Sequence, residues 1–94
     1  MNKYETIFII RPEAEEELVQ SLIEKTTGII ETNGSVESID QWGKRKLAYE
    51  VKGFKEGYYV LMNYTADPAI PAELDRVFKI TEDIIRHIII KEEE

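Results

Sequence analysis

Apolar positions recur along the chain with two periods, and in its first third these periods predict a strand followed by a helix. Residues 4 to 10 alternate with period two, which predicts a β-strand that ends before Pro12. From residue 18 to residue 30 the apolar positions fall three and four apart, which predicts a helix with one buried face. Asn33 and Gly34 end this helix, and Gly34 is expected to take the left-handed conformation that satisfies terminal carbonyl groups.

The middle of the chain predicts two further strands. Residues 35 to 52 form the first, with Gly43 as an interruption and a candidate β-bulge. A turn is expected from Gly53 to Gly57. The segment YYVLMNYTA, residues 58 to 66, is the second of these strands.

A short helix and a fourth strand complete the pattern. The helix is expected to start at Pro71 and to bury three large side chains, Leu74, Val77 and Phe78. Residues 84 to 91 form the last strand, and the acidic end from Lys91 to Glu94 is expected to fray.

The order βαββαβ predicts an α+β class of fold. With a right-handed crossover in each half, it gives the ferredoxin-like arrangement, a four-stranded antiparallel sheet with both helices on one face. The length of 94 residues suits a single domain over 1–94, in which residues 92–94 are an acidic tail.

Two helices cover only one face of such a sheet, yet the segments YYVLM and HIII are apolar on both faces. The uncovered face is therefore expected to expose apolar side chains, and such a patch usually marks a partner surface. Tyr59 and Leu61 are candidates for partner contact. Trp42 is a third candidate, with the protein core and an RNA surface as its alternatives.

Composition and charge narrow the function. The chain has no cysteine, which excludes disulfides and thiolate metal sites and fits a reducing cytoplasm, and no apolar run approaches a membrane span. The formal net charge is −7, but acidic residues gather at 13–17 and 92–94. Between Lys44 and Lys55 the local net charge is instead +4. A long-range attraction to polyanions is not predicted, whereas a local basic site remains open.

Catalytic and metal chemistry find little support in the residues. His87 has no carboxylate beside it in its strand, so a structural or surface role is favoured over catalysis. The serines lack a nucleophile elbow, and the glycines do not have the spacing of a phosphate-binding loop. The glutamates from 13 to 17 point in several directions from a helix start, which favours a solvated face over a metal site. We expect neither an enzyme nor a bound cofactor.

The segment WGKRKLAYEV places three cations, Lys44, Arg45 and Lys46, between two aromatic residues. Cations neutralise phosphates and aromatic rings stack on unpaired bases, which suits RNA binding. Alternation puts Lys44 and Lys46 on one face and Arg45 on the other, unless Gly43 resets the register. The alternative reading is that these cations protect an edge strand from unwanted pairing.

Three segments, KYETIFIIRPE, WGKRKLAYEV and GYYVLMNY, resemble the bacterial small-subunit ribosomal protein S6 family. The similarity runs from Lys3 to about Lys91. It implies a non-enzymatic, RNA-binding component of the small ribosomal subunit in the cytoplasm, acting in translation. It further implies binding to the central domain of small-subunit ribosomal RNA as a heterodimer with ribosomal protein S18. By position, the resemblance implies phosphate contacts at five residues: Lys3, Lys44, Arg45, Lys46 and Arg86. It also implies that Tyr4 and Tyr49 either pack the backbone or touch sugar and base.

Two other functions remain as alternatives. A ferredoxin-like sheet also occurs in small-molecule-binding regulatory domains, although only fold analogy supports that reading. An acyl-phosphate hydrolase would need an arginine in an anion-binding loop, and Arg11 is surrounded by acids that repel phosphate.

Overall fold

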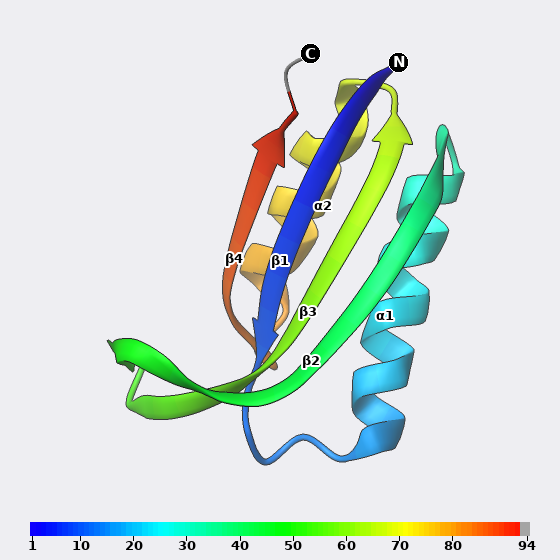
Figure 1. The fold of residues 1–94 in the computed structure, drawn as a ribbon. Coiled ribbons are helices and arrows are strands. Elements are labelled where there is room, and N and C mark those ends of the chain that lie inside the picture. Colours follow the sequence, from blue (N-terminus) through cyan, green and yellow to red (C-terminus); the bar gives the residue numbers. More distant parts are fainter. Residues whose placement is uncertain (93–94) are drawn as a thin grey trace.

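The computed structural model describes residues 1–92 and contains a four-stranded antiparallel sheet with two helices (Figure 1). The strands lie in the order β2-β3-β1-β4, which is the predicted ferredoxin-like arrangement. The six elements follow one another along the chain as β1 Asn2–Ile10, α1 Glu16–Glu31, β2 Gly34–Val51, β3 Phe54–Ala66, α2 Ala69–Ile80 and β4 Ile84–Lys91.

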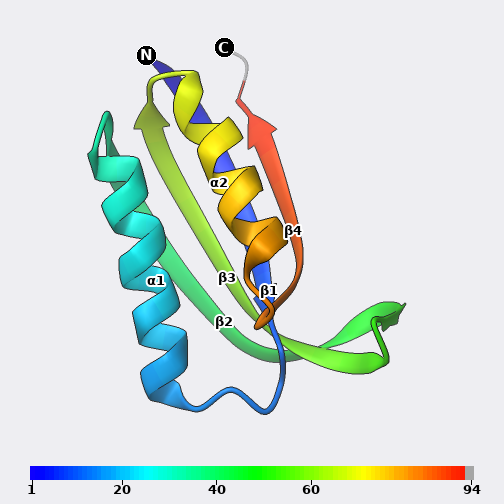
Figure 2. The same ribbon diagram turned by 180° about the vertical axis from the view of Figure 1, so that it is seen from behind.

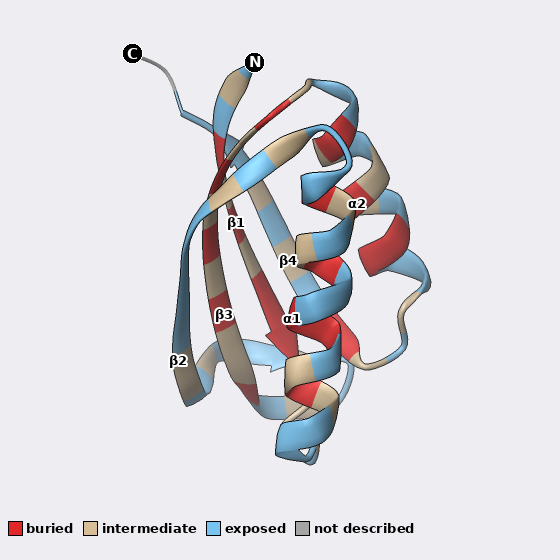
Figure 3. Ribbon diagram, turned by 90° about the vertical axis from the view of Figure 1, so that its right-hand side faces the viewer, coloured by how far each residue is buried: buried red, intermediate tan, exposed pale blue. Residues whose placement is uncertain are grey.

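Both helices lie on the same face of the sheet, as predicted (Figure 2). Helix α1 contacts β2 and β3, whereas α2 contacts β4. Figure 3 shows the buried positions gathered between the sheet and the helices. The core there is built from alternate residues of the two central strands and one face of each helix, including Phe8, Met62, Ile30 and Leu74. Tyr64 is also fully buried, and its hydroxyl is satisfied by Thr6 at 2.8 Å.

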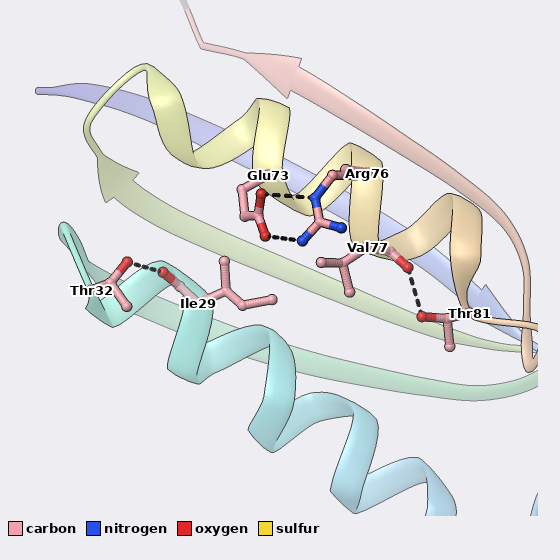
Figure 4. Close-up of polar contacts among 6 residues, drawn as sticks. All are labelled: Ile29, Thr32, Glu73, Arg76, Val77 and Thr81. Carbon is pink, nitrogen blue, oxygen red and sulfur yellow. Dashed lines mark hydrogen bonds and ion pairs between the residues drawn. The ribbon is translucent and has the colours of Figure 1, made fainter.

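The end of α1 corrects the prediction made for Gly34. The helix ends at Glu31, and the Thr32 hydroxyl donates to the carbonyl oxygen of Ile29 at 2.7 Å (Figure 4). Gly34 is not among the residues with a positive φ; it begins β2 instead. A Cβ at this position would overlap the carbonyl oxygen of Thr65, so close approach to β3 is what requires glycine here.

The turn between β2 and β3 is shorter than predicted. Val51 pairs with Phe54, so only Lys52 and Gly53 form the turn, with φ values of 51° and 84°. Two residues with positive φ match the twist of the flanking strands, which is why this turn joins a hairpin well. Gly57 lies inside β3, where a Cβ would overlap the side chain of Ile9. Gly57 is needed for close packing and not for a turn. The turn predicted to extend to Gly57 was therefore too long.

Helix α2 begins at Ala69, earlier than the predicted start at Pro71. Asp67 explains the earlier start because its carboxylate accepts a hydrogen bond from the Ala69 amide at 2.9 Å. At the other end, the Thr81 hydroxyl donates to the Val77 carbonyl at 2.6 Å (Figure 4). The predicted burial of Leu74, Val77 and Phe78 is confirmed.

Strand β4 runs from Ile84 to Lys91, as predicted. The fraying predicted from Lys91 onward does not begin there, because the Glu92 amide donates to the carbonyl oxygen of Lys3 at 2.9 Å. The remainder of the predicted tail, Glu93 and Glu94, lies outside the described residues.

The packing between α2 and the sheet predicts a large difference between two similar substitutions. Leu74 is fully buried, so Leu74→Ala is expected to lower the free energy of unfolding by about 2–5 kcal/mol. Ile80 ends the same helix with 67% of its surface exposed, so Ile80→Ala should change stability by less than about 0.5 kcal/mol. Urea unfolding followed by circular dichroism measures both, and equal losses would contradict this account of the core.

Candidate partner and nucleic-acid interface

The sheet face opposite the helices, called the open face below, carries apolar side chains near its centre. Ile7 of β1 lies between Leu61 of β3 and Ile88 of β4 in the strand register. Leu61 and Ile7 are half-buried, and Ile88 is 42% exposed. Since no helix covers this row, the predicted apolar surface on the uncovered face is present.

The open face changes character along the strands. Toward the start of β1, Glu5 pairs with Asn63 and Lys3 pairs with Thr65, so this end of the face is polar. Toward the end of β1, Ile9 pairs with Tyr59 and makes the face apolar. The apolar half therefore lies next to the hairpin that joins β2 to β3.

The distal part of that hairpin, residues 43–59, is called the basic hairpin below. In Figure 1 its tip (green) lies beyond β4, on the opposite side of the sheet from the rest of β2. Between the hairpin and the sheet is a cleft of about 290 Å³. Its lining comes from the hairpin, β1 and β4: Ile7, Ile9, Leu47, Ala48, Tyr49, Val51, Tyr59, Arg86 and Ile88.

Gly43 explains how Trp42 reaches the open face. Gly43 has a φ of 79°, and the pairing with β3 shifts between Gln41 and Gly43, which confirms the predicted bulge. Trp42 is the extra residue of this bulge, and its ring stacks on that of Tyr59 with centroids 6.0 Å apart. The guanidinium of Arg45 lies over the Trp42 ring, 5.1 Å from its centroid. Of the three locations considered for Trp42, the core is therefore excluded.

The three consecutive cations divide between two faces. Lys44 pairs with Tyr58 and Lys46 with Glu56, whereas Arg45 pairs with Gly57. The predicted alternation is thus confirmed beyond the bulge, and only Arg45 belongs to the open face. All three side chains are exposed, and none forms a salt bridge with any of residues 1–92. Strand β2 is also an edge of the sheet, which keeps the edge-protection reading of the lysines open.

The remaining candidates for RNA contact lie in different surroundings. Arg86 is exposed on the open face, and its Nη1 donates to the hydroxyl of Tyr49 at 2.6 Å. Lys3 is exposed at the polar end of the same face, away from the basic hairpin. Tyr4 is only 6% exposed, and its ring stacks on Tyr64 in the core at 5.6 Å. Of the two roles that the resemblance implies for Tyr4, this burial favours packing over contact with sugar and base.

His87 faces the helices, and its hydrogen-bond partner is Asp75, a residue that the sequence pattern around His87 did not reveal. Its Nε2 lies 2.7 Å from a carboxylate oxygen of Asp75 on α2, and its ring packs on Phe78. Lys79 approaches the same carboxylate at 2.8 Å. These two contacts, with that of His87 the larger, lower the pKa of Asp75 below its ordinary value. The group joins α2 to β4, which agrees with the structural role favoured for this histidine.

Arg11, the arginine considered for an acyl-phosphate site, is held by carboxylates. Its Nε donates to Asp83 at 2.6 Å, and Glu13 lies 3.9 Å from its Nη1. The hydrogen bond to Asp83 also raises the pKa of Arg11, because it favours the charged guanidinium. An incoming phosphate would have to displace this carboxylate, so the geometry opposes that activity.

The described part of the chain offers neither a metal site nor a membrane-spanning helix. Within residues 1–92, no three histidine, aspartate or glutamate side chains converge as a metal site would require. Neither helix in that range has the length and apolar character needed to cross a membrane.

Comparison with known proteins gives consistent matches over nearly the whole chain. Residues 3–91 match the family model described as ribosomal protein S6. The small ribosomal subunit protein bS6 of Clostridium perfringens strain SM101 is 61% identical, and the match covers 100% of both chains. The bS6 protein of Clostridium kluyveri strain ATCC 8527 is 56% identical over 99% of each chain. The crystal structure of 30S ribosomal protein S6 from Thermotoga maritima superposes with a TM-score of 0.90 at 34% identity, covering 97% of this chain and 87% of that one.

The carboxylate shared by His87 and Lys79 predicts a pH-dependent part of stability. Because the folded state lowers the pKa of Asp75, its contribution is fully present above the ordinary aspartate pKa and is lost as the pH falls through the lowered value. Asp75→Asn is therefore expected to be destabilising at pH values above the ordinary aspartate pKa and to converge with the wild type as the pH falls below the lowered pKa. Urea unfolding across this range gives both curves, and a difference that stays constant with pH would contradict the assignment.

Proposed function

The chain belongs to the ribosomal protein S6 family, a structural rather than enzymatic family of the small ribosomal subunit, and we propose that it binds the central domain of small-subunit ribosomal RNA as a heterodimer with ribosomal protein S18. The observation that carries this proposal is the open face. It combines an apolar half with exposed arginines, and neither α1 nor α2 covers it.

In this proposal the protein partner covers the apolar half of the open face. Tyr59, Leu61 and Trp42 are the proposed contacts on that surface, and the cleft that Tyr59 lines accepts an apolar side chain. Burial of apolar area gives the main favourable free energy of such an interface. Leu61, Ile7 and Ile88 form an uncharged row across the sheet centre, and the first charge beside this row is the exposed Asp40 of β2, opposite Leu61.

The RNA contacts lie around that surface. Lys44 and Lys46 project from the outer side of the basic hairpin, while Arg45 and Arg86 border the apolar half. Lys3 extends the set at the polar end. Cations arranged in this way recognise phosphate positions and the shape of a folded RNA rather than its sequence. Since the chain has a net charge of −7, the partner is expected to supply the additional cations that tight RNA binding needs.

RNA binding by the heterodimer tests the proposal. The chain alone is expected to bind a central-domain RNA fragment weakly, and the chain mixed with S18 tightly and with strong salt dependence. In the pair, Lys44→Ala combined with Lys46→Ala should reduce the slope of log affinity against log salt by about two, one for each lost phosphate contact. Lys25→Ala, an exposed lysine on α1, is the matched control and should leave the slope unchanged. Filter binding or fluorescence anisotropy at several salt concentrations measures the affinities and this slope.

Two outcomes would contradict separate parts of the proposal. If the isolated chain bound the RNA as tightly as the pair does, the composite surface would be wrong. If binding needed S18 but the lysine double variant kept the wild-type slope, Lys44 and Lys46 would be protecting the edge of β2 instead of contacting RNA.

A further inference from the structure

Tyr49 and Arg86 meet across the whole width of the sheet. Tyr49 belongs to β2 and Arg86 to β4, which are the two outer strands of the order β2-β3-β1-β4. They come together because the basic hairpin passes over the open face. The contact is double: Arg86 Nη1 donates to the Tyr49 hydroxyl at 2.6 Å, and the guanidinium carbon lies 5.3 Å from the centroid of the same ring.

The hairpin tip needs such an anchor because its own ladder is interrupted there. Lys46 pairs with Glu56, and the next paired residue of β2 is Val51, which is opposite Phe54. The four residues between them, 47 to 50, therefore have no partner on β3 in the described register, and Tyr49 is one of them. Outside the paired register, this segment also depends on side-chain contacts with the body of the protein, and within residues 1–92 its polar side-chain contact is the one with Arg86.

The same contact also orders Arg86. A guanidinium that is free in solvent samples many rotamers, and ordering it on an anion costs conformational free energy. Holding it against the ring and the hydroxyl of Tyr49 removes part of that cost in advance. One N–H group is used by Tyr49, and the remaining N–H donors of the planar guanidinium stay available for a phosphate.

We infer that Tyr49 is a positioning residue for Arg86: it holds the guanidinium and the hairpin tip together so that Arg86 is preset to bind an RNA phosphate. Tyr49 acts through Arg86 and does not itself stack on a base. The inference rests on the proposed RNA-binding function and assigns a separate role to one residue within it.

A double-mutant cycle on the heterodimer separates positioning from direct contact. Tyr49→Phe keeps the ring and removes the hydroxyl, and Arg86→Gln removes the cation. If Tyr49 acts through Arg86, Tyr49→Phe weakens RNA binding about threefold in the wild-type background, as expected for one exposed charged hydrogen bond, and has no effect when Arg86→Gln is already present. Equal losses in both backgrounds would overturn the inference, because a direct contact of Tyr49 with RNA does not depend on Arg86.

Hydrogen exchange on the free chain provides a readout that does not need RNA. The backbone amides of the paired residues that flank the tip, Lys46, Val51, Phe54 and Glu56, are expected to exchange about threefold or more faster in Tyr49→Phe and in Arg86→Gln than in the wild type. Arg76→Gln is the matched control, because Arg76 is an exposed arginine paired with Glu73 on α2, remote from the hairpin (Figure 4). Unchanged exchange at these flanking residues would overturn the inference, whatever the RNA result. If wild-type heterodimer bound no RNA, the proposed function would fail, and with it the RNA-presetting role that Tyr49 is assigned.

Discussion

The structure depends on one constraint: two helices cover one face of a four-stranded sheet and leave the other face without cover. On the covered face, alternate residues of β1 and β3 meet the apolar faces of α1 and α2 and form the buried core. On the other face, the same strands place residues such as Ile7 and Leu61, which are only half-buried. A chain of this size therefore has to shield that face itself or offer it to a partner.

The chain does both in part. Strands β2 and β3 extend past the sheet and bend back over the apolar half of the open face, where the bulge at Gly43 turns Trp42 onto Tyr59. Arginines complete the arrangement at two places, Arg45 over Trp42 and Arg86 over Tyr49. A cleft of about 290 Å³ still remains between hairpin and sheet. The surface is thus apolar at its centre and carries arginines beside the hairpin, while Asp40 and Glu5 add carboxylates at its other margins.

Local sequence patterns predicted most of the fold, whereas features that depend on the close approach of distant segments escaped them. Period and turn residues located all six elements and the ends of β4, because these reflect interactions between neighbours in the chain. The predictions of a helix cap at Gly34 and a turn at Gly57 were wrong, because neighbouring strands approach these positions too closely for a side chain. Likewise, the carboxylate that binds His87 comes from another element, so no pattern around His87 contained it.

The arrangement of the candidate residues was only partly predictable from the sequence. Alternation separated Arg45 from its two lysine neighbours, and this follows from strand geometry alone. Tyr49 meets Arg86 only because the hairpin crosses the sheet. Predicting the burial of Tyr4 requires knowing which face of β1 meets the helices. Neither is encoded in local spacing. These contacts emerged only when the bend of β2 and the layer order were known.

The central claim is that the open face is the surface by which this chain assembles. Hydroxyl-radical footprinting of the chain, alone and mixed with S18, tests it most directly, with Trp42, Tyr59 and Leu61 as reporters of the open face. The account predicts strong protection of these side chains in the mixture, while the exposed Ile80 on α2 reacts equally in both samples. Protection on the helical layer with an unchanged open face would contradict it.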